Sequence, residues 1–369
     1  MSEKKLNLAF LDAITRHQAY LYRASSQNIN EILREFNIVS GDMLNQLRDY
    51  LDNLSHSELI ALSGGKYTTP ELRRVRELIN GWRDSMRDEA QQGVSTSAAT
   101  LSAYETGYTA TLAGEKLAKV ITGERLYSKA KNIPMSGGAL VDELFSKTAD
   151  DAKQRVEYAI RSGITNGDTT QQIVQRIKGT KRLNYQDGIL NSTRSAIERD
   201  VRTIRSHVSN QVVEDTFVQL GYDYLKVVAT LDGRTSKVCA SKDGEVYHHS
   251  DSFSRPPYHP NCRTILVGCD KDGNLIGRRP FVADTRPVSK IPKDDRDGVI
   301  GQVNSNTDYS SWFGNQSTSF QKEWLGKNRY ELYKNGNYDI DRFVDPQGKM
   351  YTLNQLKLLD KQTFEELGL

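Results

Sequence analysis

Residues 254–264 read SRPPYHPNCRT, and no other stretch of the chain has a comparable composition. It contains three prolines, a histidine and a cysteine. Because proline fixes φ and has no N–H group, this stretch cannot form the interior of a helix or a central strand. We predict a constrained loop, and the question is whether it holds a metal, a substrate or only its own fold.

The composition indicates a polar, globular protein of more than one domain. At roughly 100–200 residues per domain, 369 residues allow two or three domains. The net charge is +3, from 50 basic and 47 acidic side chains, which gives no sign of a general polyanion binder. Three cysteines are too few, and odd in number, for a secreted disulfide scaffold. The first ten residues lack the apolar core of a signal peptide, and no run approaches the ~20 apolar residues of a membrane span. We therefore expect a protein made in the cytoplasm, with no membrane partner.

Hydrophobic periodicity predicts helices through the first two thirds of the chain. Thr69 is a predicted N-cap, followed by Pro70 at the first helical position. Asp168 and Gln171 are predicted to form a capping box. The apolar stripes include Leu11, Ile14, Leu21, Ile29, Ile32 and Phe36, then Leu72, Val75, Ile79, Trp82 and Met86, then Val141, Leu144, Phe145, Ala149, Ala152, Val156 and Ile160, and finally Ile197, Val201, Ile204, Val208, Val212 and Phe217.

The period changes after Gly221. YLKVVATLD, residues 224–232, alternates apolar and polar side chains and predicts a strand with one buried face. GEVYH and TILVG are shorter strand candidates. Residues 278–311 are rich in proline, glycine and charge, and show little periodicity, so they predict a linker.

Together these patterns predict an α+β protein. We expect a helical region over residues 1–130 and a motif domain over 131–277, in which helices precede a small β-rich unit. The linker over 278–311 would lead to a short helical tail over 312–369.

The small β-rich unit contains the residues with metal-binding chemistry. Cys239, His259 and Cys262 have side chains suited to zinc. A structural zinc site takes four ligands, however, and Ser236 stands where a CxxC doublet would begin. Neither Cys269 nor Asp232 has a usual spacing for the fourth ligand. We therefore expect no cofactor, with zinc as the alternative, because buried cysteines commonly act as small hydrophobic side chains.

Other polar residues of this region allow both structural and catalytic interpretations. In LDGRTS, Asp232 and Arg234 predict a clamp around a tight turn, whereas the catalytic alternative makes Asp232 a general base or metal ligand. His248 and His249 with Asp251 resemble a fragment of a histidine-metal nuclease, but loop histidines explain them better. Basic residues also line the long helix, interleaved with acids, and this predicts a solvated face with local ion pairs: Arg194, Arg199, Arg202 and Arg205.

The motif as a whole resembles the phage Mu F-like minor head proteins, a family of phage head-morphogenesis proteins. The similarity is carried by TLDGRTSKVCASKDGEVY and PPYHPNCRTILV. The matching residues are Thr230, Asp232, Arg234, Thr235, Cys239, Asp243, Gly244, Pro256, Pro257, His259, Pro260, Cys262 and Arg263. The chain also departs from the family, since many relatives have cysteines where this chain has Ser236 and Thr264. That joint loss is expected if the extra pair made a metal site or cross-link that this protein lacks, so the motif is expected to hold its own domain in shape.

The resemblance implies a minor head (capsid) protein of a tailed bacteriophage, located inside the head or at its portal vertex. The implied partner is the portal protein, and scaffolding protein, major capsid protein and packaged double-stranded DNA are further candidates. Amphipathic helices with surplus apolar positions, including Trp82 and the stripe over 10–36, would form the portal-binding surface. We expect no enzymatic activity. The alternative is a metal-dependent nuclease or a toxin-like effector carried in the virion.

Overall fold

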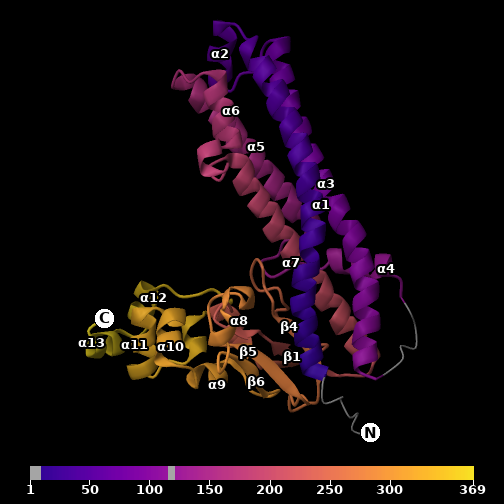
Figure 1. Ribbon diagram of the computed structural model, residues 1–369, viewed down its shortest axis with the longest axis vertical. Helices are drawn as coiled ribbons and strands as arrows, with labels where there is room; N and C mark the ends of the chain where they lie inside the picture. Colours follow the sequence, from indigo (N-terminus) through magenta and orange to yellow (C-terminus); the bar gives the residue numbers. More distant parts are fainter. Residues whose placement is uncertain (1–9, 115–120) are drawn as a thin grey trace. The chain divides into compact units, whose positions relative to one another are not determined.

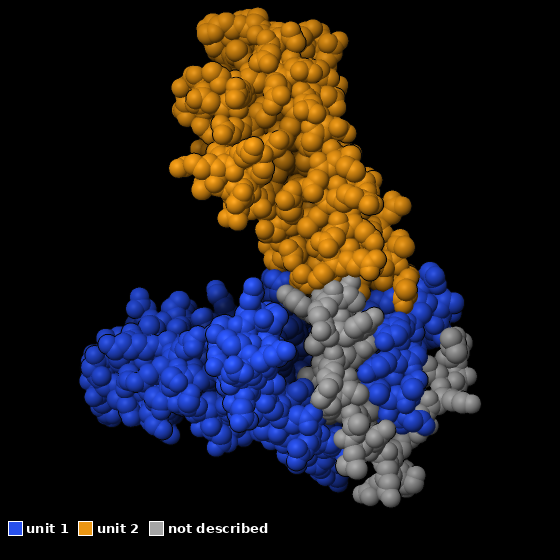
Figure 2. Space-filling model, in the orientation of Figure 1, with its two compact units in different colours: residues 1–21, 101–126, 206–369 blue, residues 22–100, 127–205 orange. Residues whose placement is uncertain are grey.

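The computed structural model describes the backbone of residues 10–114 and 121–369, and the side chains of residues 25–114 and 121–369 (Figure 1). The chain divides into two compact units (Figure 2). Residues 22–100 and 127–205 form one, called here the helical unit. Residues 1–21, 101–126 and 206–369 form the other, called here the mixed unit. The predicted stripe positions Leu11, Ile14 and Leu21 have side chains outside the described residues.

The helical unit takes its residues from the first seven α-helices of the chain (Figure 1). Their bounds are α1 Phe10–Asp52, α2 His56–Ser63, α3 Pro70–Leu112, α4 Gly123–Lys131, α5 Val141–Thr165, α6 Thr170–Lys178 and α7 Ile189–Gln219, with a short 3-10 helix η1 at Lys181–Leu183. Helices α1, α3, α4 and α7 also contribute residues to the mixed unit. Mainly helical α+β architecture is thus confirmed.

The apolar stripes predicted from the sequence form the core of the helical unit. Ile32 of α1 packs directly on Gly93 of α3, so closely that a Cβ at Gly93 would lie 2.6 Å from the Ile32 side chain. Trp82 is only 3 % exposed, and its indole N–H donates to Ser40 Oγ at 3.0 Å. Trp82, Ile32 and Phe36 are therefore core residues, which makes the prediction of a portal-binding surface at these positions wrong.

The helix caps follow the predicted chemistry with one shift of register. Thr69 Oγ1 accepts the backbone N–H of Leu72 at 3.2 Å, which confirms this N-cap. The capping box of α6 is formed by Thr169 and Gln172, one residue later than predicted. Asp168 instead accepts from the Arg176 guanidinium at 2.6 Å, because Thr169 has the extended backbone conformation that an N-cap requires.

The mixed unit contains two three-stranded sheets (Figure 1). In the first, β1 (Tyr224–Val228) lies between β3 (Val246–His248) and β4 (Ile265–Cys269), antiparallel to both. In the second, β5 (Arg278–Val282) lies between a parallel β2 (Leu231–Asp232) and an antiparallel β6 (Ile300–Asn304). The predicted strand over 224–232 is therefore divided between the two sheets.

Residues 278–311, predicted as a linker, contain β5 and β6 together with the 3-10 helices η2 (Val288–Lys290) and η3 (Lys293–Asp295). The linker prediction is wrong because it treated every charged residue as solvated. Arg279 of β5 is only 2 % exposed and is bound by buried acceptors.

The C-terminal tail is helical, as predicted, but it packs as part of the mixed unit. Its elements are α9 Tyr309–Gly314, α10 Thr318–Leu325, α11 Lys327–Asn335, η4 Ile340–Phe343, α12 Leu353–Leu359 and α13 Lys361–Leu367. Tyr309, Trp312, Phe313 and Trp324 form an aromatic core with Leu231 of β2. The phenol of Tyr309 donates to the carbonyl of Asp232 at 2.9 Å, so the tail completes the second sheet.

A second apolar core lies between α7 and the first sheet. Phe217 of α7 is fully buried, and a Cβ at Gly268 of β4 would lie 2.5 Å from its ring. The Asn210 amide, also on α7, donates to the carbonyl of Thr264 and accepts the N–H of Leu266. Across the described residues, no helix combines the length and apolar composition needed to cross a membrane.

Candidate functional site

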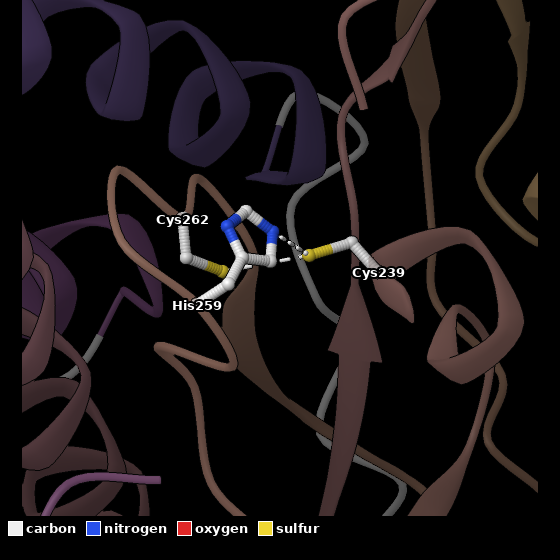
Figure 3. A group of neighbouring side chains, drawn as sticks. All are labelled: Cys239, His259 and Cys262. Carbon is white, nitrogen blue, oxygen red and sulfur yellow. Dashed lines mark hydrogen bonds between the residues drawn. The ribbon is translucent and has the colours of Figure 1, made fainter. Parts of the chain in front are cut away.

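Three predicted candidate residues meet in the mixed unit, beside the first sheet (Figure 3). Cys239 lies on the short helix α8 (Lys237–Lys242), whereas His259 and Cys262 lie on the constrained loop over 254–264. Ser236 caps α8, because its Oγ accepts the backbone N–H of Cys239 at 3.1 Å. The loop includes a cis peptide bond between Pro256 and Pro257, and both prolines are buried.

The side-chain atoms of these residues are within contact distance of one another. Cys239 Sγ lies 3.0 Å from His259 Nε2 and 3.5 Å from Cys262 Sγ. Ser236 Oγ lies 2.8 Å from the same imidazole nitrogen. The two cysteines are 3 % and 4 % exposed and His259 is half-buried, so the group lies just below the surface. We call Ser236, Cys239, His259 and Cys262 the thiol–imidazole cluster.

One hydrogen bond fixes the orientation of the His259 ring. Its Nδ1 lies 2.8 Å from the carbonyl oxygen of Pro260. Because a carbonyl only accepts, Nδ1 must carry a proton, which leaves the lone pair of a neutral ring on Nε2. That lone pair faces Ser236 and Cys239.

The two thiols differ in acidity. The hydrogen bond from Cys262, together with those from the Ser236 and Thr264 hydroxyls, lowers the pKa of Cys239 to about 7 against the opposing effect of burial. Burial and the neighbouring sulfur of Cys239 raise the pKa of Cys262 well above its usual value. Cys239 is therefore the thiol of the pair that ionises first.

A second group of motif residues forms a salt-bridged turn next to this cluster. The Arg263 guanidinium donates to both carboxylate oxygens of Asp232, at 2.6 and 2.8 Å. Asp232 also accepts the Thr235 hydroxyl at 3.0 Å and the backbone N–H of Arg234 at 3.0 Å. The clamp exists, but the predicted arginine is wrong, because the Arg234 side chain points to solvent and Arg263 makes the fork.

Asp243 is the centre of the third group of polar contacts in the motif. Its Oδ1 accepts the N–H of Ala229 and a guanidinium N–H of Arg279, both at 2.7 Å. Its Oδ2 accepts the N–H of Tyr309 at 2.6 Å. Gly244 follows with φ of +94°, a conformation that favours glycine and turns the chain into β3. Sequence analysis did not identify Arg279, because it lies in a charged stretch that was predicted to be a linker.

Further motif residues have simpler structural roles, and one contact was missed. Pro260 is exposed, and its part in the site is the carbonyl that holds His259. Arg255 donates twice to the Glu214 carboxylate, at 2.9 and 2.8 Å, and so ties the constrained loop to α7. Sequence spacing could not pair Arg255 with a glutamate so distant along the chain.

The histidine pair on the first sheet forms a separate group. Asp223, His248 and His249 have potential ligand atoms within 4.8 Å of one another. Asp251, however, accepts the backbone N–H of His248 at 3.2 Å, and His248 Nδ1 lies 2.7 Å from Ser250 Oγ. Asp251 thus stabilises the turn. The acidic residue that lies beside the two histidines is Asp223, and not Asp251 as the sequence suggested.

Two of the α7 arginines form the predicted local ion pairs, whereas Arg194 bonds to a distant residue of α1. Arg199 pairs with Asp200 at 2.8 Å, and Arg202 pairs with Glu198 at 2.7 Å. Arg194 donates to Asn37. The Arg202 side chain is only 11 % exposed, so this face is more buried than the sequence suggested.

Buried salt-bridged turns around a compact thiol–imidazole cluster define the motif domain. Residues 154–267 match the model of the family described as phage Mu protein F like protein, which is the family that the motif resembles. Residues 154–267, which are less than half of the chain, are therefore similar to phage Mu F-like proteins. No curated protein matches the chain, and no solved structure does.

Proposed function

We propose that this protein is a minor head protein of a tailed bacteriophage, bound to the portal and acting in head assembly and in DNA packaging or delivery. The observation that supports the proposal is the family match over residues 154–267. The proposed location is the virion, inside the head or at its portal vertex. Scaffolding protein, major capsid protein and packaged DNA are the further partners that this location would offer.

The use of the motif carboxylates supports a structural role. Asp232 is held by a bidentate arginine, a hydroxyl and a backbone N–H. Asp243 is held by two backbone N–H groups and Arg279. A general base needs an oxygen that faces its substrate, whereas these oxygens already accept hydrogen bonds inside the fold. We therefore propose that the motif domain is not an enzyme.

The portal-binding surface is proposed on the helical unit, at residues other than the buried Trp82. Ile38, Ile60 and Tyr158 are 52 %, 59 % and 68 % exposed there. Exposed apolar side chains of this size contribute strongly to protein interfaces, whose affinity survives salt better than that of charge-based contacts. Leu358 and Leu359, on α12 of the mixed unit, are also exposed and provide a matched comparison.

The test is co-expression of the full chain with the portal protein of the phage that encodes it, followed by size-exclusion chromatography at low and high salt. We expect co-elution with the portal at both salt concentrations. We also expect loss of co-elution for Ile60→Ser with Tyr158→Ser, and retention for Leu358→Ser with Leu359→Ser. Separate elution of the wild-type chain from the portal would refute the association, and the reverse result for the variants would place the surface on α12.

A second function has one observation in its favour. Asp223, His248 and His249 could hold a divalent cation, which is the requirement for a metal-dependent nuclease or a related effector. Incubation of the full chain with DNA and Mg²⁺, Mn²⁺ or Zn²⁺ tests this. Cleavage that His248→Ala abolishes would establish the nuclease and overturn the proposal of a purely structural protein.

A further inference from the structure

We propose that the thiol–imidazole cluster is a zinc site, with Cys239, His259 and Cys262 as ligands and Ser236 at the fourth position. Counting ligands along the sequence gave only three and argued against a metal. The structure adds the fourth group, because Ser236 Oγ lies 2.8 Å from His259 Nε2 and hydrogen-bonds to Cys239. The proposal does not depend on the role of the protein in the phage head.

The distances between the donor atoms fit a tetrahedral ion. With bonds of about 2.3 Å to sulfur and about 2.0 Å to nitrogen, two sulfurs of a zinc tetrahedron lie about 3.8 Å apart, and sulfur and nitrogen about 3.5 Å apart. The corresponding distances here are 3.5 Å between the sulfurs and 3.0 Å from Cys239 Sγ to His259 Nε2. An opening of about half an ångström would admit the ion. Of the three proposed ligands with soft donor atoms, only His259 is partly exposed, so we expect its side chain to make this movement.

The imidazole is already oriented as a ligand. Metal-bound histidines almost always donate their other N–H to a carbonyl or carboxylate, which fixes the tautomer and the ring plane. His259 makes this contact through Nδ1 to the Pro260 carbonyl. Without a metal, the single lone pair on Nε2 faces two hydrogen-bond donors, the Ser236 hydroxyl and the Cys239 thiol. One cation that displaces the thiol proton removes this competition.

The charge and the hydrogen bonds around the sulfurs also suit zinc. Two thiolates and a neutral imidazole balance the charge of Zn²⁺, which matters because the cysteines are 3 % and 4 % exposed. The hydroxyl of Thr264 hydrogen-bonds to the Cys239 sulfur, and its backbone N–H hydrogen-bonds to the Cys262 sulfur. Such donors stabilise thiolates and are the outer contacts that metal–thiolate sites use.

A path for the ion exists on the side of the constrained loop. Pro260 and Asn261 are exposed, and His259 and Ser236 are half-buried, so the ligands on this side lie near solvent. The fourth position would be taken by the Ser236 oxygen or by a water beside it. The ion would connect the start of α8 to the loop over 254–264. In this proposal, the role of the proline-rich loop is to hold two of the zinc ligands in position.

A disulfide between Cys239 and Cys262 is the competing use of the same atoms. It requires the sulfurs to approach from 3.5 Å to about 2.0 Å. It would also leave the lone pair of His259 Nε2 without the sulfur ligand that it faces. A zinc ion uses all the donor atoms of the cluster, whereas a disulfide uses two of them.

The experiment uses the full chain, purified under reducing conditions. Elemental analysis should find about one zinc per chain, because the cluster offers one tetrahedral position. After chelation, titration with Co²⁺ should give the visible bands of tetrahedral cobalt and a thiolate-to-cobalt charge-transfer band. Mass spectrometry of alkylated protein should show that zinc protects Cys239 and Cys262, while the protection of Cys269 is unchanged.

Three variants sharpen the test. Cys262→Ser should lose the zinc and the cobalt spectrum. Cys269→Ser is the matched control, because Cys269 is also buried but belongs to the core between α7 and the first sheet, and this variant should keep the metal. Ser236→Cys should bind zinc more tightly, by on the order of tenfold or more, because a fourth thiolate replaces the weaker oxygen ligand.

The proposal is overturned by a fully reduced wild-type chain that contains no zinc and gives no cobalt spectrum. It is also overturned by metal that Cys262→Ser retains, or by a Cys239–Cys262 disulfide as the form isolated under reducing conditions. If Cys262→Ser does not fold, the alkylation pattern of the wild-type protein with and without zinc decides the question.

Discussion

The buried pair of Asp243 and Arg279 gives the sharpest test of how the mixed unit is held together. Their side chains are 0 % and 3 % exposed, and 2.7 Å separates the charged atoms. Asp243 also accepts the N–H groups of Ala229 and Tyr309, so one carboxylate connects the first sheet, the second sheet and the tail. We expect Asp243→Ala to unfold the mixed unit more readily than any exposed substitution.

The expected cost follows from what the substitution leaves behind. Arg279 would keep its bonds to the carbonyls of Ala229 and Thr307 but lose its counter-charge in a buried position. Removing one partner of a buried ion pair costs about 3–5 kcal/mol. The two backbone N–H groups lose their acceptor, at about 1–3 kcal/mol each where water cannot replace it. Since water can enter the space left by the carboxylate, we expect a total of about 3–5 kcal/mol.

Urea unfolding followed by tryptophan fluorescence measures this change. Two of the three tryptophans, Trp312 and Trp324, lie in the aromatic core next to Tyr309. At about 1–3 kcal/mol per molar urea, a loss of about 3–5 kcal/mol should lower the midpoint by roughly 1–5 M. Glu365→Gln is the control, because Glu365 pairs with Lys361 and both side chains are exposed, at 61 % and 76 %, so its midpoint should stay at the wild-type value.

A double-mutant cycle separates the pair from its surroundings. Asp243→Asn and Arg279→Met together should cost less than the sum of the two single changes, by about 0.5–3 kcal/mol, because each single change leaves a buried group without its partner. A midpoint for Asp243→Ala equal to that of the exposed control would refute the reasoning. Strict additivity in the cycle would show that the pair is not coupled.

Further outcomes test individual contacts by the same unfolding measurement. Arg263→Ala should cost about 1–3 kcal/mol by leaving a buried carboxylate underused, whereas Arg234→Ala should stay within about 0.5 kcal/mol because that side chain is exposed; the opposite order would restore the sequence-based clamp. Burial, with the nearby Arg329, lowers the pKa of Lys237 to about 8. Between about pH 8 and 10.5 the unfolded chain therefore binds more protons than the folded chain, so the free energy of unfolding should rise with pH in this range. Lys237→Met should remove that rise, and an identical pH profile for the two proteins would contradict the assignment. Gly268→Ala should cost about 1–3 kcal/mol because the new methyl would lie 2.5 Å from an aromatic ring, while Gly81→Ala, in open space on α3, should gain up to about 1 kcal/mol.

Local signals predicted the elements of this fold better than its assembly. The structure confirms three predictions that depend on neighbouring residues: the stripe ending at Met86, the cap at Thr69 and the strand starting at Tyr224. The division of residues 224–232 between two sheets depends on β5, whose own sequence looked like a linker. Charged residues are exposed only on average, and Arg279 is an exception: its guanidinium is buried because it pairs with the Asp243 carboxylate.

The candidate site shows the same limit at the level of single contacts. The motif named Asp232, but a one-dimensional pattern favoured the adjacent Arg234 over Arg263, which is 31 positions away and makes the contact. Likewise, the spacing of the motif residues indicated three zinc ligands, and Ser236 stood where a fourth ligand, a cysteine, would be expected. In the folded protein, the serine that caps α8 places its oxygen against His259, and the spacing of residues along the sequence does not show this contact.

The hydrogen bonds that each polar group already makes inside the fold indicate which part of the motif can still bind a ligand. Asp232 and Asp243 direct their oxygens at arginines, hydroxyls and backbone N–H groups, so their binding capacity is spent inside the fold. In the thiol–imidazole cluster, by contrast, Cys239 Sγ and Ser236 Oγ both contact the lone pair of His259 Nε2, and Cys262 Sγ lies beside Cys239 Sγ. The carboxylates therefore hold the turns, and the soft ligands are the groups that a cation can still bind. If the cation is bound, the proline-rich loop is stabilised by its ligands as well as by its prolines, and chelation should loosen residues 254–264 before it affects the aromatic core around Trp312.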